Sequence, residues 1–115
     1  MTSVDMPATL PEVTPALART AAQYDEVPYQ SHAFPLTHPA RLAAIATLFG
    51  LTPPDVATAR ILEIGCAAGG NIIPLAAHLP GAACLGIDLS GVQIEQAQRR
   101  AQGLGLRNLE LRRQS

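Results

Sequence analysis

The feature that most constrains the fold is a short apolar run that ends in a loop rich in glycine. The run covers residues 60–64 and the loop covers residues 65–70, with the letters GCAAGG. An apolar run of this length that stops at glycine is typical of a buried strand. Glycine removes the side chain where a chain must turn sharply from a strand into a helix. The segment therefore predicts a strand, a tight loop and a helix in succession.

The same alternation continues to the end of the chain. Residues 72–79 read as a helix, 83–88 as a second strand and 108–113 as a third. Ser90 and Gln93 match a capping box for the helix between the last two strands. Such alternation predicts an α/β fold, a Rossmann-like three-layer sandwich with a parallel sheet. The sheet is expected to be incomplete, because 115 residues are few for a full doubly wound enzyme.

The N-terminal half predicts helices separated by proline-rich stretches. An alanine-rich run over 16–23 favours a short helix, and YDEVPYQSHAFPLTHP over 24–39 favours an extended path because of its prolines. Pro39 suits the first turn of a helix that Gly50 ends. Apolar side chains recur at helical spacing in this helix and in the one after Ser90, at Leu42, Ile45, Ala46 and Phe49 and at Ile94, Ala97, Ala101 and Leu104.

Composition narrows the function classes. With 48% hydrophobic and 15% charged residues the chain is expected to fold, and a net charge of -1 gives no general attraction to nucleic acid or anionic membrane. Cys66 and Cys84 are too far apart for a zinc or redox CxxC motif, so no metal site is expected. Without a signal peptide or a membrane-length apolar stretch, a cytoplasmic protein is expected.

Two carboxylates stand where the predicted strands end. Parallel strands bind ligands beyond their carboxyl ends, so Glu63 and Asp88 are candidates for a site there. Asp88 follows the glycine loop at a spacing that suits hydrogen bonding to ribose hydroxyls. Glu63 is placed to attract an ammonium group, while a helix after the loop would favour a carboxylate. The alternatives, a simple glycine turn and Asp88 as a helix cap, stay open at this point.

These residues carry a family resemblance. Residues 61–70 (ILEIGCAAGG) and 86–90 (GIDLS) resemble the E/D-x-G-x-G-x-G loop and the acidic second-strand end of class I S-adenosylmethionine-dependent methyltransferases. Ala67 departs from the pattern, since it stands where the middle glycine is usual, and it requires a φ angle that alanine can adopt. The resemblance implies S-adenosylmethionine as cofactor and direct in-line methyl transfer to an acceptor that the sequence does not identify.

The resemblance also implies a set of cofactor-binding residues. Glu63 would bind the methionine end, Asp88 the ribose, and Leu89 and Gln93 the adenine side. The loop positions that would line the cofactor's approach are Gly65, Cys66, Ala67 and Gly69. No base stands beside Cys66 in the sequence, so this thiol reads as a small loop residue and not as a nucleophile. No catalytic residue is assigned.

The proline-rich stretch resembles a segment that precedes the glycine loop in a bacterial methyltransferase group with a further regulatory domain downstream. In that interpretation Tyr24, His32 or His38 would help to close the cofactor pocket. The expected organisation is then a mobile arm over 1–15, a helical and loop segment over 16–56 that caps the cofactor site, and the first part of the cofactor-binding domain over 57–115.

Two rival functions remain. A nicotinamide or flavin nucleotide-binding domain shares the strand, loop and spaced acid, but its G-x-G-x-x-G is absent, and Glu63 would repel a pyrophosphate. The second rival is a non-catalytic fragment, which fold alone does not exclude. An incomplete sheet would expose an edge and apolar surface, so self-association of the 115-residue chain is expected.

Overall fold

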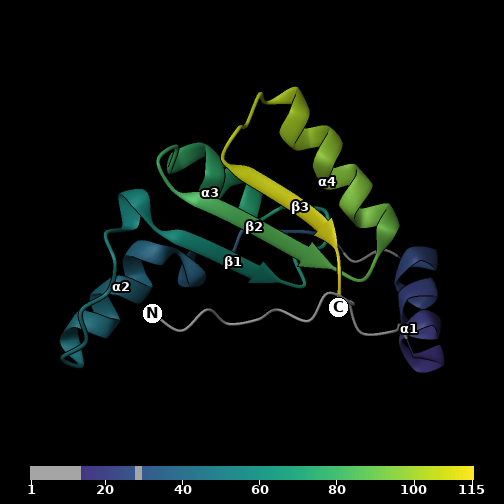
Figure 1. The fold of residues 1–115 in the computed structure, drawn as a ribbon, viewed down its shortest axis with the longest axis horizontal. Helices are drawn as coiled ribbons and strands as arrows, with labels where there is room; N and C mark the ends of the chain where they lie inside the picture. Colours follow the sequence, from purple (N-terminus) through teal and green to yellow (C-terminus); the bar gives the residue numbers. More distant parts are fainter. Residues whose placement is uncertain (1–13, 28–29) are drawn as a thin grey trace, which may run out of the picture.

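The computed structural model describes residues 14–27 and 30–115, and within them a parallel sheet carries helices on one face (Figure 1). Prolines begin two of the helices, where their missing N–H groups are not needed. In chain order the elements are α1 (Pro15–Glu26), the 3-10 turn η1 (Pro35–Thr37), α2 (Pro39–Leu48), the 3-10 turn η2 (Val56–Thr58), β1 (Arg60–Ile64), α3 (Ile72–His78), β2 (Ala83–Asp88), α4 (Gly91–Gly103) and β3 (Leu109–Arg113).

The strands lie in the order β1-β2-β3, and both neighbouring pairs are parallel. Leu62 pairs with Leu85, and Leu85 pairs in turn with Glu110. This arrangement confirms the predicted Rossmann-like α/β fold with an open parallel sheet. The parallel register brings the ends of β1 and β2 together, because Ile64 lies opposite Ile87.

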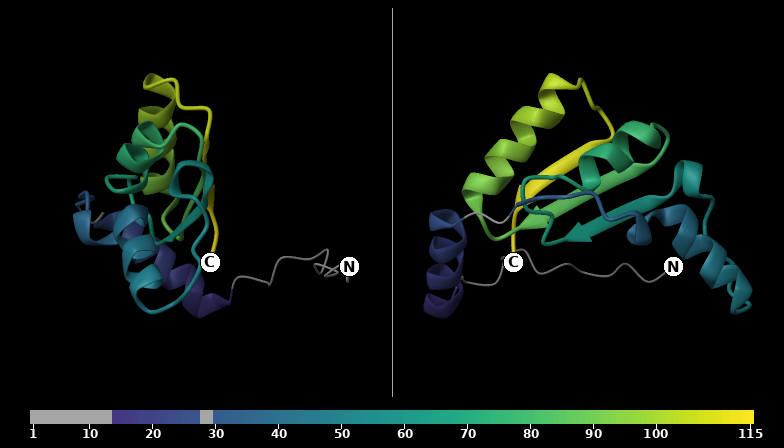
Figure 2. Two further views of the ribbon diagram at one scale, coloured as in Figure 1. Left: turned by 90° about the vertical axis from the view of Figure 1, so that its left-hand side faces the viewer. Right: turned by 180° about the vertical axis from the view of Figure 1, so that it is seen from behind.

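The core lies between the sheet and the helices α3 and α4. Both helices pack on the same face, as the edge-on view shows (Figure 2). Ile72 and Ala97 are fully buried there, and they meet Cys84 and Leu111 from the strands. Two helices on one face are what successive right-handed crossovers in one direction produce.

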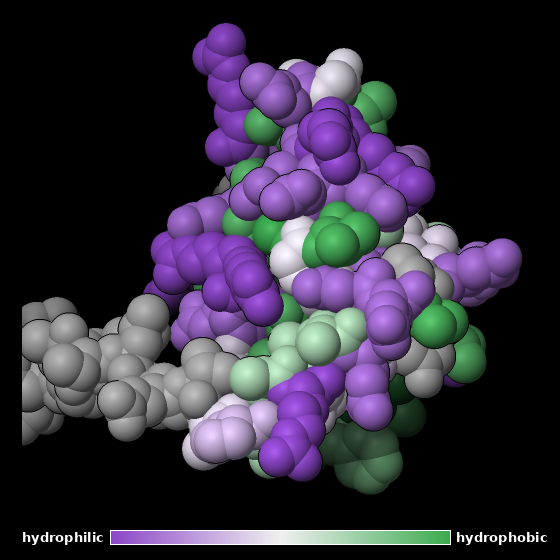
Figure 3. Space-filling model, turned by 90° about the vertical axis from the view of Figure 1, so that its right-hand side faces the viewer, coloured by the Kyte–Doolittle hydropathy of each residue, from purple (hydrophilic) through white to green (hydrophobic). Residues whose placement is uncertain are grey.

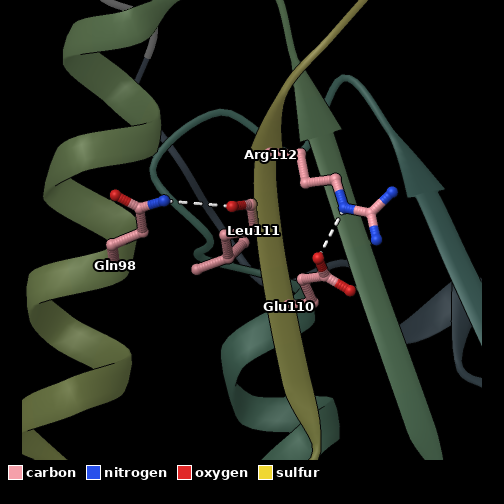
Figure 4. A network of polar contacts seen from close by, with 4 residues as sticks. All are labelled: Gln98, Glu110, Leu111 and Arg112. Atoms are coloured by element: carbon pink, nitrogen blue, oxygen red, sulfur yellow. Dashed lines mark hydrogen bonds and ion pairs between the residues drawn. The ribbon is translucent and has the colours of Figure 1, made fainter.

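The opposite face of the sheet has no helix over it in the described part of the chain (Figure 2). Leu62 and Ile64 are 57% and 77% exposed there. On β3 the same face carries Glu110 and Arg112, which form an exposed ion pair, whereas Gln98 of α4 donates to the Leu111 carbonyl from the other side (Figure 4). Two of the three predicted layers, the sheet and one helical layer, are therefore present in the described ranges.

Several details differ from the sequence-based expectation. Helix α1 continues through Tyr24–Glu26, because the first proline of the stretch stands only at position 28. Leu104, the last apolar residue at helical spacing after Ser90, lies outside the helix and is 63% exposed, since α4 ends just before it. Helix α2 forms, but none of its side chains is buried. The expected arm lies outside the described residues up to position 13, and Pro15 already belongs to α1.

Within residues 14–27 and 30–115, none of the helices is long and apolar enough to cross a membrane.

Candidate functional site

The loop between β1 and α3 has three residues in the left-handed region. Gly65 and Gly69 have φ of 75° and 79°, which glycine adopts at no steric cost, and Ala67 between them has φ of 49°. A left-handed alanine costs about 1–2 kcal/mol, so something else must hold it. A side chain at Gly65 would meet nothing within 4 Å, which leaves the backbone there open to a ligand.

Asp88 holds this loop from the end of β2. Its Oδ2 accepts a hydrogen bond from the Ala67 backbone N–H at 2.8 Å, and its Oδ1 accepts one from the Ser90 N–H at 2.8 Å. An ionised carboxylate has about four acceptor positions, so roughly half remain available. The single carboxylate therefore fixes the loop, starts the turn into α4 and keeps capacity for further donors.

A cavity of about 530 Å³ opens beside these groups. It lies at the carboxyl ends of β1 and β2, where ligands bind in parallel sheets. Figure 3 views the molecule from the side on which α1 and α4 lie, and hydrophilic side chains dominate that surface. The cavity is lined by Leu17, Tyr24, Ile64, Gly65, Ala67, Ile87, Asp88, Leu89, Gln93, Gln114 and Ser115.

The start of α4 forms one wall of the cavity. Ser90 is fully buried, and its Oγ accepts from the Gln93 N–H at 3.2 Å, which confirms this half of the predicted capping box. The other half is absent, because the Ser90 N–H is already bonded to Asp88. The Gln93 side chain is 2% exposed, and its Oε1 atom has no hydrogen-bond partner in the part of the chain that the structure describes. A buried acceptor of this kind is suited to a donor from a ligand.

Helix α1 reaches the same region. The Asp25 carboxylate accepts a hydrogen bond from the Ser90 hydroxyl and another from the Val92 N–H at 3.3 Å. The Ser90 bond holds the pKa of Asp25 below its ordinary value, with smaller contributions in the same direction from Val92 and Arg113. This contact brings Leu17 and Tyr24 to the cavity.

Glu63 lies beneath the loop and not in this cavity. Its Oε1 accepts a hydrogen bond from the Asn71 side-chain amide at 2.7 Å, and its Oε2 is buried without a partner within residues 14–27 and 30–115. Burial raises the pKa of Glu63, and the hydrogen bond from Asn71 opposes that rise. Glu63 and Asn71 border a second cavity of about 600 Å³ between α2 and the free edge of β1.

Residues 30–37, here called the strap, cross the glycine loop on the side of α3. The Gly70 N–H donates to the Ser31 hydroxyl at 2.7 Å, and the Phe34 N–H donates to the Asn71 side-chain oxygen at 2.8 Å. A Cβ on Gly70 would stand 2.5 Å from the Ser31 backbone, so only glycine permits this approach. A pyrophosphate would need the amides at this turn free. The geometry therefore disfavours the dinucleotide-binding rival.

Cys66 belongs to the core. Its side chain is 3% exposed and stands against Gly86, where a Cβ would lie 2.9 Å from the sulfur. Burial, with smaller contributions from Asp88 and Glu63, raises the pKa of this thiol to about 12. The thiol is neutral at ordinary pH, and a neutral thiol is a poor nucleophile.

The predicted site residues thus divide into two groups. The first group lines the 530 Å³ cavity and comprises Gly65, Ala67, Asp88, Leu89 and Gln93. Cys66, Gly69 and Glu63 lie outside that lining, in or under the loop. His38 is the N-cap of α2, where its Nδ1 accepts from the Ala40 N–H.

Comparisons with known proteins agree with this geometry. A family model described as a methyltransferase domain matches residues 61–115. PKMT2 from Rickettsia typhi, solved in complex with AdoHcy, is 40% identical with a TM-score of 0.72, over 76% of this chain and 17% of that chain. Over residues 61–115 the chain is therefore similar to class I S-adenosylmethionine-dependent methyltransferases. The nucleotide-binding alternative is not favoured.

Two curated relatives come from Rickettsia prowazekii (strain Madrid E). The uncharacterized protein RP789 is 52% identical over 87 residues, which are 76% of this chain and 16% of the relative. The uncharacterized protein RP028 is 43% identical over 89 residues, 77% of this chain and 36% of the relative. The chain therefore spans about a sixth and about a third of the lengths of these two relatives.

Sequence reasoning missed three residues that organise the site: Asn71, Ser31 and Asp25. Asn71 contacts both Glu63 and the strap, Ser31 holds Gly70, and Asp25 holds Ser90. The one local signal is Asn71 itself, a polar residue at the start of the helix after two glycines. The partners of Ser31 and Asp25 lie 39 and 65 residues away, so no local pattern reveals them.

Proposed function

We propose that the protein binds S-adenosylmethionine in the 530 Å³ cavity and transfers its methyl group to an acceptor by direct in-line displacement. The observation that carries this proposal is the set of hydrogen-bond acceptors along the cavity. Asp88 has unused carboxylate capacity, and Gln93 has a buried acceptor atom without a partner. Ribose hydroxyls and an adenine amino group are donors, so the residues present fit the cofactor.

Each predicted residue then takes a role. Asp88 accepts from the two ribose hydroxyls, Gln93 and Leu89 contact the adenine side, and the loop residues Gly65 and Ala67 allow close approach of the backbone. Glu63 acts on the ammonium of the methionine end from beneath the loop, directly or through water. The AdoHcy complex of the 40% identical PKMT2 supports this use of the site.

The N-terminal residues cap the site in this proposal. Leu17 and Tyr24 of α1 line the cavity, and the Asp25 contact with Ser90 keeps α1 beside α4. The strap covers the loop from the α3 side through Ser31. Together they would shield the cofactor from water, which strengthens the electrostatic interactions inside the site.

The chain's own residues need only bind and orient the reactants. S-adenosylmethionine, when bound, supplies a methyl group already activated on a sulfonium, so the reaction requires no covalent enzyme intermediate. Orientation of two reactants alone can contribute several orders of magnitude in rate. The pKa of Cys66, raised to about 12, fits a mechanism without a thiol nucleophile.

The activity is tested with the full-length protein and methyl-tritiated S-adenosylmethionine. Cell extract supplies the acceptors, and label is counted after separation into protein, nucleic acid and small molecules. Label transfer to one class identifies the acceptor, and the Cys66→Ser variant is expected to keep that transfer. Absence of transfer in every fraction, despite cofactor binding, would favour the non-catalytic alternative. Loss of transfer in Cys66→Ser with intact binding would contradict the mechanism.

A further inference from the structure

Asn71 connects two parts of the site that are far apart in the sequence. Its amide nitrogen donates to Glu63 Oε1 at 2.7 Å and to the Thr37 hydroxyl at 3.2 Å, and its oxygen accepts from the Phe34 N–H at 2.8 Å. The residue is 9% exposed. Both ends of its amide are therefore used, one mainly by the carboxylate and the other by the strap.

The position of Asn71 alone would suggest a different role. It is the N-cap residue of α3, where an asparagine side chain ordinarily accepts a hydrogen bond from the helix backbone. No such capping bond forms here. The side chain is directed instead to Glu63 and to the strap, so stabilising the helix start does not explain its orientation.

We propose that Asn71 is a positioning residue, which couples the strap to the Glu63 carboxylate and so orients that carboxylate toward the ammonium end of the cofactor. The inference rests on the proposed function and names how one end of the cofactor is recognised. Asn71 occupies one carboxylate oxygen, the Ile72 backbone N–H also acts on the carboxyl group, and the other oxygen, Oε2, is buried without a hydrogen-bond partner among the described residues. An ammonium, directly or through water, supplies the donor that Oε2 lacks.

The charge of Glu63 depends on the same contact. Burial raises the pKa of this carboxyl, and the Asn71 hydrogen bond is the largest influence that opposes the rise. Without the Asn71 amide, the neutral form of Glu63 becomes more populated, and the carboxylate loses its fixed orientation. Both changes weaken attraction for an ammonium and leave adenine and ribose contacts on the Asp88 side untouched.

The test compares two ligands that differ at that end. S-adenosylhomocysteine carries the amino-acid group, and 5′-methylthioadenosine lacks it. In full-length Asn71→Ser, a serine remains a good N-cap but its hydroxyl is too short to reach Glu63. Calorimetry should show S-adenosylhomocysteine binding about ten-fold weaker, the loss expected for a hydrogen bond to a charged group, with methylthioadenosine within about two-fold of wild type. Equal changes for both ligands would overturn the inference.

Asn108→Ala is the matched control. Asn108 is another partly buried asparagine, and its amide bonds the carbonyls of Ala76, Leu79 and Ala82 at the opposite end of α3. Its loss should lower stability without changing the ratio of the two affinities. A ratio shifted as much as in Asn71→Ser would assign the effect to general destabilisation and overturn the inference.

Thr37→Val tests the link if Asn71→Ser does not fold, because Thr37 is exposed and its hydroxyl accepts from the Asn71 amide. The same hydroxyl also donates to the Phe34 carbonyl, so the variant loosens the strap at both contacts with this hydroxyl. The affinity ratio should move in the same direction by about two-fold, and an unchanged ratio would count against the coupling. Wild-type protein that binds neither ligand would contradict the proposed function itself. This outcome differs from a failure of the inference about Asn71, in which the wild type binds both ligands.

Discussion

The Asp88 carboxylate accepts a hydrogen bond at 2.8 Å from the backbone N–H of Ala67, the single non-glycine residue with positive φ among those described. The acid at the end of β2 thus stabilises a strained conformation in the loop after β1. Asp88 is the residue proposed to bind ribose, and the same carboxylate also orders the loop. The proposed ribose contact and the loop geometry therefore depend on one side chain.

Ala67→Gly should stabilise the protein. Glycine removes the cost of about 1–2 kcal/mol for a left-handed alanine but adds about 0.5–1 kcal/mol of chain entropy, so the net gain lies between about 0 and 1.5 kcal/mol. Urea unfolding measures this change. The neighbouring Ala68→Gly is the control and should destabilise, because Ala68 is 4% exposed and has no positive φ. Equal changes in the free energy of unfolding for both variants would contradict backbone strain at Ala67.

Much of the fold follows from local patterns. The predicted strands at 60–64 and 83–88 coincide with β1 and β2, because short apolar runs flanked by glycine favour parallel strands. The predicted burial of the first strand is wrong: none of its residues is buried, since β1 is an edge strand and one face of the sheet has no helix over it in the described part of the chain. The third prediction differs from β3 by one residue. The capping serine at position 90 predicts the start of α4 for the same local reason.

The long-range contacts of the site are not encoded locally. The Asp88 bond to Ala67 spans 21 residues, and the Asp25 bond to Ser90 spans 65. No periodicity or spacing in the sequence distinguishes Asp88 or Asp25 from an acid that is exposed to solvent. Glu63 was predicted at the correct strand end, but its place beneath the loop depends on Asn71 and the strap, which come together only in the folded chain.

Gly70→Ala should disrupt the strap. The added Cβ would stand 2.5 Å from the backbone carbon and oxygen of Ser31, and backbone cannot move aside as a flexible side chain does. We expect a loss of about 1–3 kcal/mol in the free energy of unfolding, the range for overpacking. Gly103→Ala is the control: its Cβ meets nothing, so it should be neutral or stabilising. Thermal unfolding of both variants checks this, and equal stability would place the strap elsewhere.

Glu63→Gln should change how stability depends on pH in the absence of ligand. Burial raises the pKa of Glu63 in the folded state above its ordinary value of 4.5. Above pH 4.5 the unfolded chain therefore loses this proton first, and wild-type stability falls as pH rises toward the folded-state pKa. Glutamine does not titrate, so the Glu63→Gln variant should lack this fall in stability.

Glu110→Gln provides a control of opposite sign. The hydrogen bond and charge of Arg112 lower the pKa of Glu110, so this residue contributes stability that is lost as pH falls. Denaturant unfolding is measured for both variants between about pH 3 and 7, the span in which carboxyl groups titrate. A Glu63→Gln profile parallel to wild type would contradict a raised pKa.

The 115-residue chain expressed alone should self-associate through the uncovered sheet face. Leu62 and Ile64 expose neighbouring apolar surface there, and no described strand pairs with the outer edge of β1. Ile64→Lys should shift light scattering toward monomer, because a charge on that face opposes its burial. Leu104→Lys, at a site that is also well exposed but lies after α4, should not. If the wild-type chain is monomeric, this surface does not drive self-association.

The most direct test of the account is calorimetric titration of full-length protein with S-adenosylhomocysteine and, separately, with a nicotinamide dinucleotide. Saturable binding of the first ligand alone is expected. Asp88→Ala should weaken it by about 1–3 kcal/mol, because it removes a charged acceptor from the ribose and releases the loop at Ala67. Unchanged affinity in Asp88→Ala, or binding of the dinucleotide in place of S-adenosylhomocysteine, would contradict the proposed site.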